Sequence, residues 1–287
     1  MKHLKFVFLI LISISTSIAC DSNGSDDEEP EVLNPLEAHT ALNVSYGSDS
    51  DQVFDLYLPA NRSSSTKTII LVHGGGWSSG DKEDMDDFKD FILDQMPSYA
   101  VVNMNYRLAD QTNEAYPMQI NDITSVVEFI GENEDYYTIS DDIGFVGASA
   151  GAHLSLLWSY GFDSANQTEM VCSVVGPTNF TDPAYLDNTN PILQALLNNL
   201  GIDTSTAYLE EISPYHRVTI SAPPTILFYG GEDPLVPTTQ GTDMQSKLAE
   251  LNVTHEFTLY PNEGHGWVGL NLLDTSVKLK AFIETHL

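Results

Sequence analysis

Short apolar runs that alternate with longer helical segments constrain the fold of this chain more than any other feature of its sequence. The apolar runs are rich in β-branched residues and lie at Thr68–His73, Ala100–Tyr106, Ile143–Gly147, Val171–Val175 and Thr225–Tyr229. Segments with helical periodicity separate several of them, at Ile120–Ile130, Ala152–Tyr160 and Thr239–Leu251. Runs that are apolar throughout are typical of parallel strands buried on both faces. The alternation therefore predicts an α/β fold with a mostly parallel central sheet flanked by helices.

The two ends of the domain and one long insert complete this prediction. Val53–Pro59 largely alternates between apolar and polar residues and predicts an early strand, whereas Glu256–Tyr260 predicts the last strand and Leu272–His286 a closing helix. An insert of residues 177–223 is rich in Asn, Asp and Pro and contains one Leu-rich helical segment at Ile192–Leu200. We expect this insert to form a small lid or pocket wall above the sheet, within a folded domain of residues 39–287.

Charge and cysteine content argue against several classes of protein. Asp and Glu number 41 and Lys and Arg number 11, which gives a formal net charge of -30 over 287 residues. Because this charge repels phosphate backbones, we expect no binding to nucleic acid. The two cysteines, Cys20 and Cys172, are too few for a disulfide-rich scaffold or a four-cysteine metal site. We expect no metal and no organic cofactor, and the apolar run around Cys172 predicts a buried thiol.

Residues 1–19 are similar to an export signal and are not expected to belong to the fold. A basic segment precedes an apolar stretch from Phe6 to Ile14, which is too short to cross a bilayer as a stable helix. Small residues then lead to Cys20, an ending that resembles the lipobox of bacterial lipoproteins, although Ser17 stands where Leu is usual. The resemblance implies that Cys20 is lipidated and that a lipid anchor holds the protein in the bacterial cell envelope, at the outer membrane and in one option on the cell surface. The alternative is an ordinary secretory signal with an incidental cysteine.

An acidic segment follows Cys20. Asp21–Pro30 contains no apolar residue that could contribute to a core and ends in proline. Such a composition is typical of a solvated linker. We expect residues 20–38 to form a flexible tether.

A serine between two glycines marks the end of one predicted strand. Gly147-Ala148-Ser149-Ala150-Gly151 is a G-x-S-x-G sequence that follows the strand and opens a helix. This is the setting of a nucleophile elbow, where the glycines avoid clashes around a strained serine. The helix N-terminus behind Ser149 favours developing negative charge. Ser149 is therefore the candidate nucleophile, and a plain strand-to-helix turn is the alternative.

A run of three glycines follows another strand, in His73-Gly74-Gly75-Gly76-Trp77. Glycines let the backbone approach a ligand and point N–H groups at it. The amides of Gly75 and Gly76, with that of Ala150, are the candidate oxyanion hole. The alternatives are a flexible loop or a phosphate-binding loop, but the phosphate-loop patterns are absent. Trp77 is a candidate for substrate contact, and packing in the core is the other interpretation.

A serine nucleophile needs a base and a carboxylate that orients the base. Asp233 follows the strand that ends at Tyr229, and Glu232 is its rival. His265 lies between two glycines after the last strand, where a loop can bring its ring to Ser149. The other histidines of the mature chain are expected to be structural or exposed, at positions His39, His73, His153, His216, His255 and His286.

The order Ser149, Asp233, His265, with the H-G-G-G-W loop before it, resembles the α/β-hydrolase esterases. The resemblance covers residues 40–287 and is closest to hormone-sensitive-lipase-like carboxylesterases and to bacterial feruloyl and acetyl esterases. Further matching segments are Asn105–Leu108, Tyr116–Pro117, Asp122 and Ala222–Thr225. Arg107 and Asp122 match scaffold positions of that family.

The resemblance implies an α/β-hydrolase fold and two-step acyl transfer from an ester to water. Ser149 would attack the ester, His265 would act as general base and then acid, and Asp233 would orient it. We expect the substrate to be a small ester or an acylated carbohydrate that loses an acetyl or feruloyl group. Substrate contacts are predicted for Trp77, Tyr106 and Trp267.

Two other functions remain open at this point. One is an amide hydrolase of the same fold, such as an arylformamidase or a peptidase. The other is a surface binding protein on an inactive hydrolase scaffold. The presence of all three candidate catalytic residues argues against the inactive scaffold.

Overall fold

The structure is a computed structural model that describes residues 32–201 and 203–287. The predicted export signal, Cys20 and the first part of the tether lie outside the described residues, so the predictions made for them stay predictions. The described chain from Val32 to Leu287 forms one compact unit.

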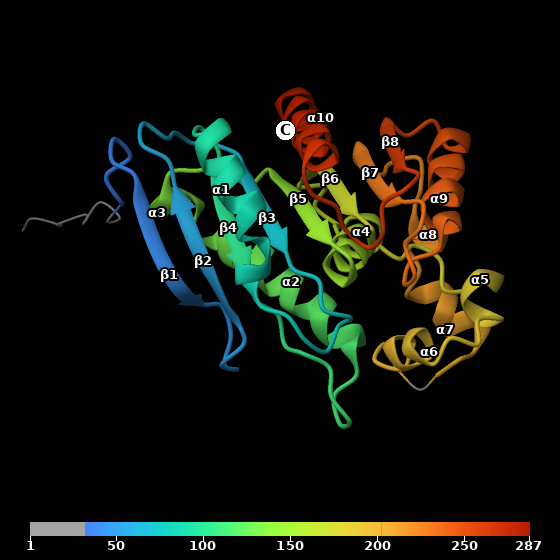
Figure 1. Ribbon diagram of the computed structural model, residues 1–287. Coiled ribbons are helices and arrows are strands. Elements are labelled where there is room, and N and C mark those ends of the chain that lie inside the picture. The colour runs from blue at the N-terminus through green and yellow to red at the C-terminus, as the bar shows by residue number, and fades with distance from the viewer. Residues whose placement is uncertain (1–31, 202) are drawn as a thin grey trace, which may run out of the picture. The chain divides into compact units, whose positions relative to one another are not determined.

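A mixed sheet of eight strands runs through this unit, in the order β1-β2-β4-β3-β5-β6-β7-β8 (Figure 1). β1 and β2 pair antiparallel, as do β2 and β4, and all other pairs are parallel. The strands are β1 (His39–Ser45), β2 (Val53–Leu58), β3 (Thr68–Val72), β4 (Ala100–Met104), β5 (Ile143–Ala148), β6 (Thr168–Val174), β7 (Thr225–Gly230) and β8 (His255–Tyr260). The predicted mostly parallel sheet is confirmed.

Helices cover both faces of the sheet. They are η1 (Lys82–Met85), α1 (Asp86–Gln95), α2 (Ala115–Glu132), α3 (Glu134–Tyr137), α4 (Ala150–Gly161), α9 (Thr238–Glu250) and α10 (Leu270–His286). Apolar side chains of α1 and α10 belong to one buried cluster, and those of α2, α4 and α9 belong to the other. The sheet therefore separates two cores, which is why β3 and β4 are buried along their whole length.

The parallel strands end along one edge of the sheet. In the ladder of β3 and β5, Val72 lies opposite Gly147. The glycine loop after β3 and the serine turn after β5 therefore begin at the same level. The loops after β7 and β8 carry Asp233 and His265 to the same edge, where ligands bind in open α/β sheets.

Residues 32–38 depart from the predicted tether. The amide of Leu33 donates to the carbonyl of Tyr136 (3.0 Å). The buried guanidinium of Arg62 donates to the carbonyls of Leu33 and Glu37. A buried guanidinium needs acceptors, and this segment supplies them. The prediction of a flexible tether is therefore wrong for these residues, and the fold also gains β1, which the sequence did not predict.

Within the described residues of the insert, 177–201 and 203–223, the chain forms four short helices instead of the single one predicted. They are α5 (Pro183–Leu186), α6 (Pro191–Leu197), α7 (Thr206–Glu211) and α8 (Pro214–Arg217). The predicted helix Ile192–Leu200 corresponds to α6. Side chains of Asp182 and Ser205 cap α5 and α7, which explains how such short helices begin in an Asn- and Asp-rich segment.

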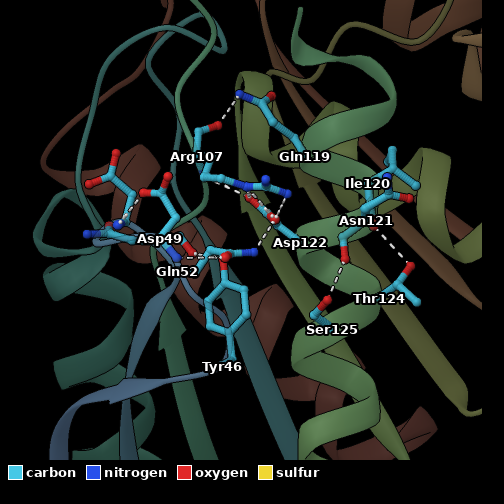
Figure 2. Close-up of polar contacts among 12 residues, drawn as sticks. Tyr46, Asp49, Gln52, Arg107, Gln119, Ile120, Asn121, Asp122, Thr124 and Ser125 are labelled. Atoms are coloured by element: carbon cyan, nitrogen blue, oxygen red, sulfur yellow. Dashed lines mark hydrogen bonds and ion pairs between the residues drawn. The ribbon is translucent and has the colours of Figure 1, made fainter. Parts of the chain in front are cut away.

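One buried carboxylate joins the end of β4 to α2. Asp122 has no exposed surface and accepts from Arg107 through the backbone N–H (2.8 Å) and through Nη2 (2.6 Å). Gln52 Nε2 also donates to Asp122 (2.9 Å), and Figure 2 shows these donors surrounding the carboxylate. Charge-assisted hydrogen bonds of this kind are stronger than neutral ones. The scaffold role expected for Arg107 and Asp122 agrees with these contacts.

We predict that Asp122→Asn lowers the free energy of unfolding by about 2–4 kcal/mol, because the new amide N–H₂ group would face donors instead of accepting from them. Urea denaturation measures the change. Asp141→Asn is the control, since Asp141 is exposed and its side chain makes no hydrogen bond among the described residues. A loss in Asp122→Asn no larger than in the control would show that this pairing contributes little to stability.

Candidate active site

A sharp turn between β5 and α4 presents Ser149. Its backbone has φ +53° and ψ −118°, a conformation that L residues rarely adopt. The turn is possible because glycines flank it. A Cβ on Gly151 would lie 2.1 Å from the carbonyl oxygen of Val72, and one on Gly147 would lie 2.6 Å from Cα of Ala152. The G-x-S-x-G sequence therefore forms the predicted nucleophile elbow in its local geometry.

Ser149, His265 and Asp233 meet in one chain of hydrogen bonds. His265 Nε2 lies 2.8 Å from Ser149 Oγ, and His265 Nδ1 lies 2.7 Å from Asp233 Oδ2. Because a carboxylate only accepts, Nδ1 carries the proton and Nε2 is free to accept from the serine hydroxyl. Asp233, whose side chain is 1% exposed, contacts the imidazole, and its rival Glu232 does not.

The second oxygen of Asp233 is held by its own loop. The backbone N–H groups of Leu235 (2.8 Å) and Val236 (3.0 Å) donate to Oδ1. These bonds hold the carboxylate in place beside His265. The base is therefore oriented before any substrate arrives.

The glycine loop after β3 lies directly beside the nucleophile. A Cβ on Gly74 would lie 3.2 Å from Cβ of Ser149. Gly75 and Gly76 have φ values of +111° and +57°, which only glycine adopts readily. Among the described residues, no acceptor takes the N–H groups of Gly75, Gly76 or Ala150. These three amides are therefore available as donors close to Ser149.

Tyr106 lies beneath this loop and does not face a substrate. It is 1% exposed, and its hydroxyl donates to the carbonyl of His73 (2.9 Å). Its ring stacks on that of His73 at 4.2 Å. Burial lowers the pKa of His73 and keeps its ring neutral. The predicted substrate contact for Tyr106 is wrong in this structure, because the side chain supports the loop from inside the core.

Trp77 is likewise buried, at 1% exposed, and anchors the loop in the core. Its indole N–H donates to His153 Nδ1 (3.0 Å), and His153 Nε2 donates to the carbonyl of Ile212 in the insert (2.8 Å). Burial lowers the pKa of His153 to about 4, so the ring stays neutral and can accept from Trp77. Of the two interpretations given for Trp77, the structure contradicts substrate contact and agrees with packing in the core.

Two polar residues that the sequence analysis missed also hold the loop. Asn199 of the insert donates to the carbonyl of Gly76 (3.0 Å) and to Ser78 Oγ (2.9 Å). Gln119 of α2 donates to the carbonyl of Trp77 (2.6 Å). The signal that could have identified Gln119 is its position as an amide on the buried face of α2, where Asp122 is the other polar residue. Asn199 gives no such signal in an Asn-rich segment.

A cavity of about 240 Å³ opens on one side of Ser149 and His265. Trp267 lines it, and the indole N–H of Trp267 donates to Thr275 Oγ1 (2.8 Å). The remaining walls come from η1, the start of α1, the ends of β5 and β6, and the segment that leads into α10. They include Asp84, Asp87, Phe88, Val174, Val268 and Leu272. The insert and the glycine loop contribute no lining residue. The insert is therefore not the wall on this side, whereas Trp267 is placed where a substrate could touch it.

Three further observations concern the described part of the chain. Within residues 32–201 and 203–287, no three or more His, Cys, Asp or Glu side chains gather in a way that could hold a metal ion. None of the helices described there is long and apolar enough to cross a membrane. Cys172 is buried in β6, and burial raises the pKa of its thiol.

Solved structures and characterised relatives resemble this chain over most of its length. Its fold matches a truncated carbohydrate esterase from gut microbiota (TM-score 0.72, 20% identity, 88% of this chain and 99% of that one). It also matches an acetyl ester-xyloside bifunctional hydrolase from Caldicellulosiruptor lactoaceticus (TM-score 0.63, 19% identity, 81% and 85%). The chain therefore has the predicted α/β-hydrolase fold.

In sequence, the chain is 26% identical over 253 residues to the esterase LipC of Mycobacterium tuberculosis. The match covers 80% of this chain and 60% of that relative. Residues 54–248, more than half of the chain, match the sequence model of one family. Together with the fold, this match shows that the chain belongs to the BD-FAE family of α/β-hydrolases.

Proposed function

We propose that this protein hydrolyses carboxylic esters by two-step acyl transfer through Ser149. The observation that carries the proposal is the unbroken chain from Ser149 Oγ through His265 to Asp233, with distances of 2.8 and 2.7 Å. A serine hydroxyl becomes a useful nucleophile only beside a base that is itself oriented. The free N–H groups of Gly75, Gly76 and Ala150 add the donors that acyl transfer requires.

In this mechanism His265 Nε2 removes the hydroxyl proton as Ser149 Oγ attacks the ester carbonyl carbon. The carbonyl oxygen becomes an oxyanion and accepts from the free backbone N–H groups. His265 then returns the proton to the leaving alcohol, and the C–O bond to that alcohol breaks. Water repeats the sequence on the acyl-enzyme and releases the acid. Asp233 keeps the imidazole in one tautomer and stabilises its charged form.

The preferred substrate class in this proposal is a small carbohydrate ester that carries an acetyl or feruloyl group. The leaving oxygen must lie next to His265 Nε2, because that atom protonates it. The cavity on the His265 side therefore takes the alcohol part of the ester. At about 240 Å³ it is smaller than a site for a drug-sized ligand, which favours one sugar residue over a long chain. The names of the carbohydrate esterase and xyloside hydrolase of similar fold support the same class.

We predict that Ser149→Ala lowers kcat on 4-nitrophenyl acetate and on methyl ferulate by about five to six orders of magnitude. Ser155→Ala is the matched control, since it removes a buried hydroxyl from α4, the helix that follows Ser149, and should leave kcat nearly unchanged. Thermal melts of both variants check the fold. Activity that survives in Ser149→Ala would contradict the proposal, and faster turnover of a matched anilide than of the ester would favour an amide hydrolase.

The carboxylates of Asp84 and Asp87 at the cavity wall predict a preference for uncharged alcohols. Two carboxylates, each about 8 Å from an anionic ligand in water, repel it by about 1 kcal/mol in total. This repulsion lowers the rate for an anionic substrate about fivefold. We therefore expect wild-type protein to prefer an acetylated methyl xyloside over an acetylated methyl glucuronoside. Asp84→Asn with Asp87→Asn should reduce the ratio of kcat/KM about fivefold at low salt.

Asp90→Asn provides the control for this charge effect, because Asp90 lies on the same helix but does not line the cavity. The ratio in this control should stay at the wild-type value. A ratio that changes equally in both proteins would assign the preference to the net charge of the chain and not to the cavity.

We also propose that Cys20 carries the lipid anchor that its sequence context implies. Full-length protein made in a Gram-negative host should sediment with membranes and enter detergent extracts. Cys20→Ser should appear in the soluble fraction with unchanged esterase activity, since a lipid anchor needs the thiol. Equal distribution of the two proteins would leave an ordinary secretory signal as the explanation.

A further inference from the structure

We infer that Gln119 is a positioning residue that sets the backbone of the oxyanion loop, Gly74–Trp77, for turnover. The inference rests on the proposed function, because its main measurement is the rate of ester hydrolysis. Gln119 lies near the start of α2, has no exposed surface and touches neither Ser149 nor His265 through a hydrogen bond. Any influence on the reaction would pass through the backbone that it holds.

Both hydrogen bonds of the Gln119 amide go to backbone carbonyls. Nε2 donates to Trp77 (2.6 Å) and to Arg107 (2.8 Å). Because carbonyls only accept, the amide nitrogen must face them, which fixes the orientation of the side chain. Its oxygen is buried and has no partner among the described residues. A buried oxygen without a partner lowers stability. The favourable contribution of this side chain therefore comes from its two donated hydrogen bonds.

The loop requires such an external support. Gly75, Gly76 and Trp77 have successive positive φ values of +111°, +57° and +63°, and Trp77 is not a glycine. A run of this kind does not persist without contacts that hold it. The Trp77 carbonyl takes two donors, Gln119 and the backbone N–H of Ala109 (2.8 Å). Since the Gly76 N–H lies one residue before Trp77, the direction of that N–H depends on where the Trp77 peptide is held.

The other end of the support is rigid. Gln119 and Asp122 lie three residues apart on α2 and therefore face the same side of the helix. Asp122 holds the N–H and the guanidinium of Arg107, while Gln119 holds the carbonyl of the same residue (Figure 2). One helical turn of α2 thus fixes both Arg107 and the oxyanion loop. Gln119 therefore fixes the position of the loop relative to the core. The loop also contacts the insert.

The test compares two buried glutamines of the same network in the full-length protein. Gln119→Met keeps the length of the side chain and removes both donated bonds. Gln52→Met is the matched control, because Gln52 donates to Asp122 but does not contact the loop. We expect similar losses of stability in urea. Deletion of a whole oxyanion donor costs about a hundredfold to a thousandfold in kcat. A misplaced donor should cost less, so kcat of Gln119→Met should fall about tenfold to a hundredfold with KM within about threefold.

Inhibition by a reversible boronic acid is a second measurement. It would not change if Gln119 only stabilised the fold. The tetrahedral adduct of the boronic acid on Ser149 uses the same N–H donors as the reaction, so Gln119→Met should weaken its inhibition by the same factor as kcat/KM. Gln52→Met should leave both values near wild type. Equal kcat in the two variants, or a loss confined to KM, would overturn the inference. Activity that survives in Ser149→Ala would instead overturn the proposed function, so the two failures are distinguishable.

Discussion

The parallel pairing of β3 with β5 is the constraint on which the candidate site depends. The ladder places Val72 opposite Gly147, so the glycine loop and the serine turn leave the sheet at one level. The first turn of α4 then packs against the end of β3 so closely that only glycine fits at position 151. This contact brings Ser149 beside Gly74, at the start of the loop that carries the free amides. Asp233 and His265 reach the same edge because β7 and β8 extend the sheet in the same direction.

Much of this arrangement could be predicted from the sequence because its signals are local. Buried parallel strands appear as continuous apolar runs, and each candidate catalytic residue follows such a run directly. The strained turn at Ser149 needs glycines at fixed positions, which makes it visible as a motif. The edge strand β1 was missed for a related reason. All of its residues are exposed or half-buried, and its sequence carries no clear alternation of apolar and polar residues.

The side chains that hold the oxyanion loop could not be predicted, because their roles depend on contacts distant in sequence. The sequence left Trp77 open between substrate contact and packing in the core, and only its distant contact with His153 of α4 decides for the core. Tyr106 fills the space beneath His73 in the same way. The insert poses a similar problem. Gln240 of α9 accepts from the backbone N–H groups of Thr178 and Asn179, both at 2.8 Å. The local sequence of the insert contains no pattern that predicts these hydrogen bonds.

The cavity beside His265 has a consequence for how such an enzyme could diversify. Its walls at Phe88 and Leu272 come from the beginnings of α1 and α10, which pack on the face of the sheet opposite α2. The supports of the oxyanion loop come from α2, α4 and the insert. Substitutions at these wall positions would therefore change which groups fit beside His265 without disturbing the supports of the loop. In a lineage with this layout, the fit of the substrate can change in small, separate steps while Ser149, His265 and Asp233 stay in place.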